Sequence, residues 1–133
     1  MKNQVIYTVV FLLIISFSIT SAHPFTAAKR NANIETNLIK NLDSEIEGLK
    51  VSSIQVLGDL KLESSVIPLQ QILNNDKNES ARIAAALSLY KIGDLRGIFT
   101  IKQTIRFDES KRVREICKNI YNQYTKNTLV AAQ

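Results

Sequence analysis

Two aspartates and two arginines recur at one spacing in this 133-residue chain. Asp76 is followed by Arg82, and 32 positions further on Asp108 is followed by Arg114. We call this spacing, from Asp76 to Asp108, the repeat interval. The guanidinium group is a planar fork of donors that suits a carboxylate or several backbone carbonyls. The pattern therefore favours hydrogen bonding within the protein, and the alternative is binding of a ligand by Arg82 or Arg114.

The other chemically versatile side chains do not form a recognisable catalytic or metal site. Cys117 is the only cysteine, so an internal disulfide is excluded, and its neighbours Ile116 and Ile120 favour a buried position. His23 is the only histidine, which leaves the body of the chain without a histidine base or zinc ligand. No phosphate-binding glycine loop or nucleophile elbow is present. We therefore expect no catalytic residue, no metal and no cofactor.

Basic residues concentrate in the C-terminal part of the chain. Residues 33–90 carry five Lys/Arg and eight Asp/Glu, whereas residues 91–126 carry nine and four. A basic helical face could attract an anionic partner, and the alternative is an ordinary solvated surface. Nucleic acid is disfavoured because no aromatic residues alternate with the basic ones. The residues expected to form a partner-binding face are Lys102, Arg106, Lys111, Arg112 and Lys118.

The spacing of apolar residues predicts that helices position these side chains. Apolar residues at steps of three and four mark one helical face between Leu42 and Leu60 and another between Val113 and Tyr124. No window shows the alternation typical of a half-buried strand. Only four glycines and two prolines are present, which disfavours a sandwich or barrel with many turns. The predicted fold class is all-α.

A short motif also occurs twice and indicates an internal repeat. LGDL at 57–60 recurs as IGDL at 92–95, and the Asp–Arg pairs recur after the slightly shorter repeat interval. We attribute the difference to loop length and expect each unit to be two antiparallel helices joined by a tight turn. Gly58 and Gly93 are predicted to lie just past helix ends in a left-handed conformation. Asp59 and Asp94 are predicted to accept backbone N–H bonds there.

These segments resemble HEAT-like repeats, of the variety also found in phycocyanobilin lyases. Residues 81–94 (ARIAAALSLYKIGD) are similar to the first helix of such a repeat, 66–73 (VIPLQQIL) to the second, and 108–114 (DESKRVR) to the inter-repeat loop. The resemblance spans roughly residues 45–124 and implies a short α-solenoid of about two and a half repeats. It also implies that the Asp–Arg pairs form a ladder of hydrogen bonds along the stack. Such repeats serve unrelated roles, so the resemblance implies a fold more than a function.

The N-terminal segment predicts export. Residues 1–22 combine a lysine near the start, an apolar run and small residues at the end, as a signal peptide does. The alternative is an uncleaved membrane anchor formed by residues 5–22. Residues 23–33 are expected to be a flexible lead-in, 34–126 the helical repeat domain and 127–133 a flexible tail.

Together these features predict a secreted or periplasmic scaffold that is not an enzyme and binds another protein through its basic helical face. The alternatives are a lyase-like HEAT-repeat enzyme and a structural, membrane-anchored component of the envelope. In this interpretation the protein touches a membrane only if its N-terminal segment is not cleaved.

Overall fold

The computed structural model describes residues 24–131, with side chains from Ala32 onward, and this part of the chain is all-α, as predicted. Its six α-helices are α2 (Pro24–Lys40), α3 (Glu47–Asp59), α4 (Val66–Asn75), α5 (Glu79–Ile92), α6 (Leu95–Phe107) and α7 (Lys111–Ala131). Two short 3-10 turns, η1 (Asn41–Asp43) and η2 (Glu63–Ser65), precede α3 and α4. The predicted signal peptide or anchor at residues 1–22 lies outside the described residues. Within them, no helix combines the length and the apolar character that crossing a membrane requires.

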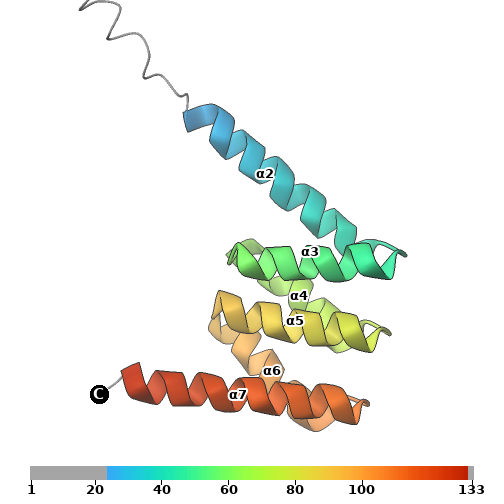
Figure 1. The fold of residues 1–133 in the computed structure, drawn as a ribbon, viewed down its shortest axis with the longest axis vertical. Coiled ribbons are helices and arrows are strands. Elements are labelled where there is room, and N and C mark those ends of the chain that lie inside the picture. Colours follow the sequence, from blue (N-terminus) through green and yellow to red (C-terminus); the bar gives the residue numbers. More distant parts are fainter. Residues whose placement is uncertain (1–23, 132–133) are drawn as a thin grey trace, which may run out of the picture. The chain divides into compact units, whose positions relative to one another are not determined.

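The packed body begins at Asn33, within α2, and continues through α7. Helices α3, α5 and α7 lie side by side in one layer, with α4 and α6 behind them (Figure 1). The three front helices run in the same direction, because each rear helix returns the chain to the side where the next front helix begins. Helix α4 packs mainly on α5, and α6 packs mainly on α7. Each rear helix therefore supports the front helix that follows it.

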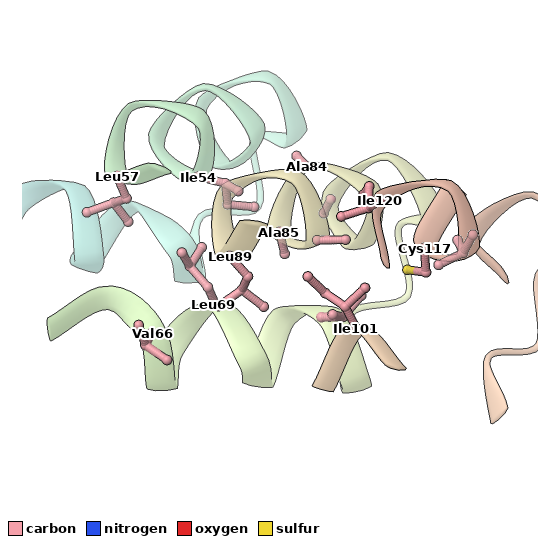
Figure 2. Close-up of a cluster of buried hydrophobic side chains, with 14 of the residues drawn as sticks. Ile54, Leu57, Val66, Leu69, Ala84, Ala85, Leu89, Ile101, Cys117 and Ile120 are labelled. Carbon is pink, nitrogen blue, oxygen red and sulfur yellow. The ribbon is translucent and has the colours of Figure 1, made fainter. Parts of the chain in front are cut away.

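Helix α5 is the centre of the core, between α3 and α7 and in front of α4. Its alanine-rich sequence suits this position, because alanine favours the helix and its small side chain lets neighbouring helices approach closely. Figure 2 shows larger side chains from the surrounding helices, including Ile54, Leu69, Ile101 and Cys117, gathered around Ala85. Burial raises the pKa of the Cys117 thiol to about 12, with a smaller effect of the Asp108 charge. The predicted buried position of this cysteine is confirmed.

The two glycines of the repeated motif occupy different positions, which corrects the prediction that both follow helix ends. Gly93 does so: its φ is +79°, and its N–H donates to the carbonyl of Leu89. Gly58 instead lies in the last turn of α3, buried against Ser88 of α5. The left-handed residue after α3 is Lys61, with φ of +50°. Lys61 and Gly93 are separated by the repeat interval, so the structural equivalent of Gly93 is this lysine.

The aspartates of the motif differ in the same way. The carboxylate of Asp94 accepts the backbone N–H of Arg96 and caps α6, as predicted. Asp59 is the last residue of α3, and its carboxylate pairs with Lys91 Nζ at 2.6 Å on the exposed surface. The predicted backbone bonds of Asp59 are absent from the hydrogen bonds of the described residues, because α3 continues past Gly58.

The first and last helices also extend beyond the boundaries expected for the helical domain. Helix α2 begins at Pro24, within the predicted lead-in, and proline suits a first helical position because its missing N–H has no partner there. Helix α7 continues to Ala131, through most of the predicted tail. The tail contains no glycine or proline to end a helix, and Asn127 Nδ2 donates to the hydroxyl of Tyr90 at 3.2 Å.

Candidate functional site

Three equivalent turns precede the front helices. The first residues of these helices follow one another at the repeat interval. In each turn a side-chain oxygen accepts the backbone N–H two residues ahead, which fixes the chain before it enters the helix. The accepting residues are Ser44, Asp76 and Asp108, which also follow the repeat interval.

One guanidinium group joins the second of these turns to the third. Arg82 Nε and Nη2 donate to the two carboxylate oxygens of Asp108 at 2.9 and 3.1 Å. Arg82 Nη1 donates to the backbone carbonyls of Asp76 and Lys77 at 2.9 and 3.3 Å. The side chains of Arg82 and Asp108 are only 5% and 6% exposed. The structure therefore brings three of the four recurring Asp and Arg residues together around one buried ion pair.

Lys50 forms the preceding pair, which the sequence interpretation missed. It lies one repeat interval before Arg82, and its Nζ donates to Asp76 Oδ2 at 2.8 Å. Burial alone would raise the pKa of Asp76. The hydrogen bonds from Lys50 and from the N–H of Asn78, with the charges of Lys50 and Arg82, outweigh burial and lower this pKa. The spacing was the available signal for Lys50, but a lysine in place of an arginine obscured it.

Arg114 follows Arg82 at the same interval and is only partly satisfied. Its Nη1 donates to the carbonyls of Asp108 and Glu109 at 2.7 and 3.0 Å, as that of Arg82 does to the preceding turn. No carboxylate among the described residues pairs with it. We call the whole series the ladder edge, formed by Lys50, Asp76, Arg82, Asp108 and Arg114.

Shallow polar grooves follow the ladder edge. One of about 480 Å³ lies beside Lys50 and Asp76, and another of about 470 Å³ lies beside Arg82 and Asp108. In the described part of the chain, no three His, Cys, Asp or Glu side chains are grouped closely enough to hold a metal ion. Because the carboxylates of the ladder edge are already paired with cations, the chemistry of these grooves is hydrogen bonding and charge recognition.

The basic residues of α6 lie on its side remote from α4. In α4, Gln70 donates to Thr100 and to a carbonyl of α6, and Asn74 lines a pocket with α6 side chains. Gln70 and Asn74 thus face from α4 toward the next rear helix. Lys102 and Arg106 hold the corresponding positions of α6, one repeat interval later, so they lie on the side of α6 that faces away from α4. Lys102 Nζ lies over the ring of Tyr121 in α7, 5.7 Å from its centroid. No further described helix covers this side.

The basic residues Lys111 and Lys118 of α7 lie on the side that, in α3 and α5, contacts the next front helix or the turn before it. Glu79, the first residue of α5, contacts the turn before α7, and Lys111 is its equivalent at the start of α7. Lys118 corresponds to Ile54 and Ala86, both fully buried, but is itself exposed. At this position α7 therefore carries an exposed charged side chain, whereas α3 and α5 carry buried apolar side chains. We call this surface the end face, formed by Lys102, Arg106, Lys111, Arg114 and Lys118.

Arg112 is the predicted partner-binding residue that does not belong to the end face. Its Nη1 lies 3.6 Å from Glu79 Oε1, so it points back to α5. The structure thus gathers four of the five predicted residues and adds Arg114, for which the sequence favoured the ladder and left ligand binding as the alternative.

Neither the models of known protein families nor the curated protein sequences give a match to this chain.

Asp94 provides a test of the electrostatics around the turns. Hydrogen bonds from the side chain and then the backbone of Arg96 lower its pKa to about 2. A depressed pKa in the folded state stabilises the protein above the ordinary value of 3.8, and this contribution disappears as the pH falls through about 2. We expect Asp94→Asn, which keeps a helix cap, to be less stable than the natural chain at pH 6 and equally stable below pH 2. Urea unfolding across this range measures the difference, and a gap independent of pH would exclude the carboxylate charge as its cause.

Proposed function

We propose that this chain is an exported scaffold, without enzymatic activity, in which HEAT-like repeats form a short α-solenoid and the end face binds another protein. The repeat part of the proposal is supported by the recurrence of one repeat interval throughout the body. The starts of the front helices α3, α5 and α7, the hydrogen bonds of the turns before them and the cations of the ladder edge follow this interval. The composition of residues 1–22 supports export.

The observation that carries the binding proposal is the charge of the end face. Five basic side chains lie on one side of α6 and α7, while Glu115 is the only acidic residue of α7. Concentrated charge of one sign steers an oppositely charged partner and favours its association. A rigid helical body supports such recognition, because little order has to be gained on binding.

Recovery of partners from the native host tests this function. The full chain, tagged at its C-terminus, is expressed in that host, and proteins bound to it in the exported fraction are identified. We expect specific partners to be retained by the natural chain and lost when Lys102, Arg106 and Lys118 are all replaced by glutamate. The control variant, in which the exposed Lys61 and Lys77 are replaced by glutamate, should keep the partners. Equal recovery with both variants would show that the end face is not the binding surface.

A further inference from the structure

Arg114 has two donor nitrogens that no described residue uses, although the equivalent nitrogens of Arg82 hold a carboxylate. We infer that Arg114 anchors an acidic segment of a partner protein, whose aspartate or glutamate side chain enters the open fork of the guanidinium group. This inference rests on the proposed function, because it names the residue and the partner chemistry of the same end face.

The geometry of Arg114 is already prepared for this contact. Its Nη1 is held by the carbonyls of Asp108 and Glu109, which orient the side chain as the preceding turn orients Arg82. In Arg82 the remaining Nε and Nη2 point to the next turn and bind Asp108 with two parallel hydrogen bonds. Because an arginine fork pairs with a carboxylate in this planar arrangement, an incoming carboxylate needs little reorganisation of Arg114.

The surroundings of Arg114 favour an acidic segment over an isolated carboxylate. Lys111 and Lys118 lie one turn before and after it on α7, and both are exposed. Glu115 offsets part of this charge, so the local field is positive but not uniform. If one carboxylate of an acidic segment enters the fork of Arg114, neighbouring carboxylates of the same segment would pair with these lysines. The expected partner therefore presents a short acidic run.

A second copy of this chain is a poor occupant. Ser44 holds the place that Asp76 and Asp108 hold in the later turns, so the first turn of another copy would offer Arg114 a hydroxyl instead of a carboxylate. Lys118 stands where α3 and α5 bury apolar side chains, so stacking another such unit would bury an unpaired charge. The occupant that fits is a different, acidic protein.

A fluorescein-labelled peptide of twelve glutamates tests this inference with the full chain. Its binding is measured by fluorescence anisotropy at low salt for the natural chain, Arg114→Gln, Arg114→Lys and the control Arg112→Gln. We expect Arg114→Gln to weaken binding at least tenfold, and Arg114→Lys to weaken it by about three- to tenfold, because lysine keeps the charge but lacks the fork. Arg112→Gln should change binding less than threefold, because Arg112 is already paired with Glu79.

Equal losses with Arg112→Gln and Arg114→Gln would overturn the inference, since only net charge would then matter. Absence of peptide binding to the natural chain would also overturn it. So would equally tight binding of a sulfated oligosaccharide or of phosphatidylglycerol vesicles, because the fork would not be selecting carboxylates. Circular dichroism checks that each variant is folded. If Arg114→Gln melts below the assay temperature, the binding of the peptide to Arg114→Lys still tests the inference.

The failure of this inference can be separated from the failure of the proposed function. If the host partner is lost with the Lys102, Arg106 and Lys118 variant but retained by Arg114→Gln, the end face binds its partner without Arg114. If no host partner is recovered at all, the proposed function fails, whatever the peptide shows.

Discussion

Replacing Arg82 with alanine is expected to reduce the free energy of unfolding by about 3–5 kcal/mol. The substitution leaves the carboxylate of Asp108 in a site where its side chain is 6% exposed, without the fork that holds both of its oxygens. An uncompensated buried charge costs far more than a lost surface ion pair. Small domains are stable by roughly 5–15 kcal/mol in total, so this loss should lower the melting temperature by about 10 °C or more.

Arg114→Ala is the matched control for this prediction. It removes the same pair of carbonyl contacts from Nη1 but no carboxylate, so we expect a loss of about 1–2 kcal/mol. The double variant Arg82→Ala/Asp108→Ala should lose less free energy of unfolding than the sum of the losses of Arg82→Ala and Asp108→Ala, because neither charge is then left without its partner. Urea unfolding of the four variants measures these energies. An unchanged melting temperature for Arg82→Ala would refute the structural role of the ladder edge.

The sequence was sufficient to predict the all-α class and the matching spacing of Arg82 and Arg114 from the aspartates before them. Helical spacing of apolar residues is a local property, and the Asp–Arg pairs recur with the same residue types. It was insufficient for Lys50 and Ser44, which occupy equivalent positions with different side chains. A pattern of residue types does not reveal a position at which the hydrogen-bonding geometry is the same but the side chain is of another type.

The charge of the end face and four of its five residues were likewise predictable, but the exchange of Arg112 for Arg114 was not. Which basic residues share a surface depends on how α6 and α7 pack, and Arg112 is excluded by its contact with Glu79 of α5. Arg114 is included because the next carboxylate of the ladder edge is missing from the described residues. Both facts concern contacts between residues that are distant in sequence.

The repeated glycine motif misled the interpretation for a related reason. A glycine before an aspartate is used either for a left-handed turn, as at Gly93, or for close approach of two helices, as at Gly58. The letters of the motif are the same in both cases. The spacing distinguishes them, because the two glycines lie further apart than the repeat interval, which the three turns before the front helices follow.

Gly58→Ala is therefore expected to destabilise the protein by about 1–3 kcal/mol, although alanine is the better helix former by about 1 kcal/mol. A methyl group at this position would lie 2.5 Å from Ser88 Oγ and 2.7 Å from Ser88 Cα. The second contact is with backbone, so a rotamer change cannot relieve it, and α3 and α5 must separate. Their separation would also strain the hydrogen bond from Ser88 Oγ to the carbonyl of Ile54, which is 2.8 Å long.

Gly48→Ala provides the opposite result within the same helix. Gly48 lies in the first turn of α3, and no atom outside the local backbone lies within 4 Å of an added methyl group. We expect this variant to be more stable than the natural chain by up to about 1 kcal/mol, since only helix propensity changes. Truncating Ser88 to alanine should not rescue Gly58→Ala, because the Cβ and Cα of residue 88 remain in the way. If Gly58→Ala instead gained stability as Gly48→Ala does, α3 and α5 would not be in contact at this glycine, and the front layer would have to be packed differently.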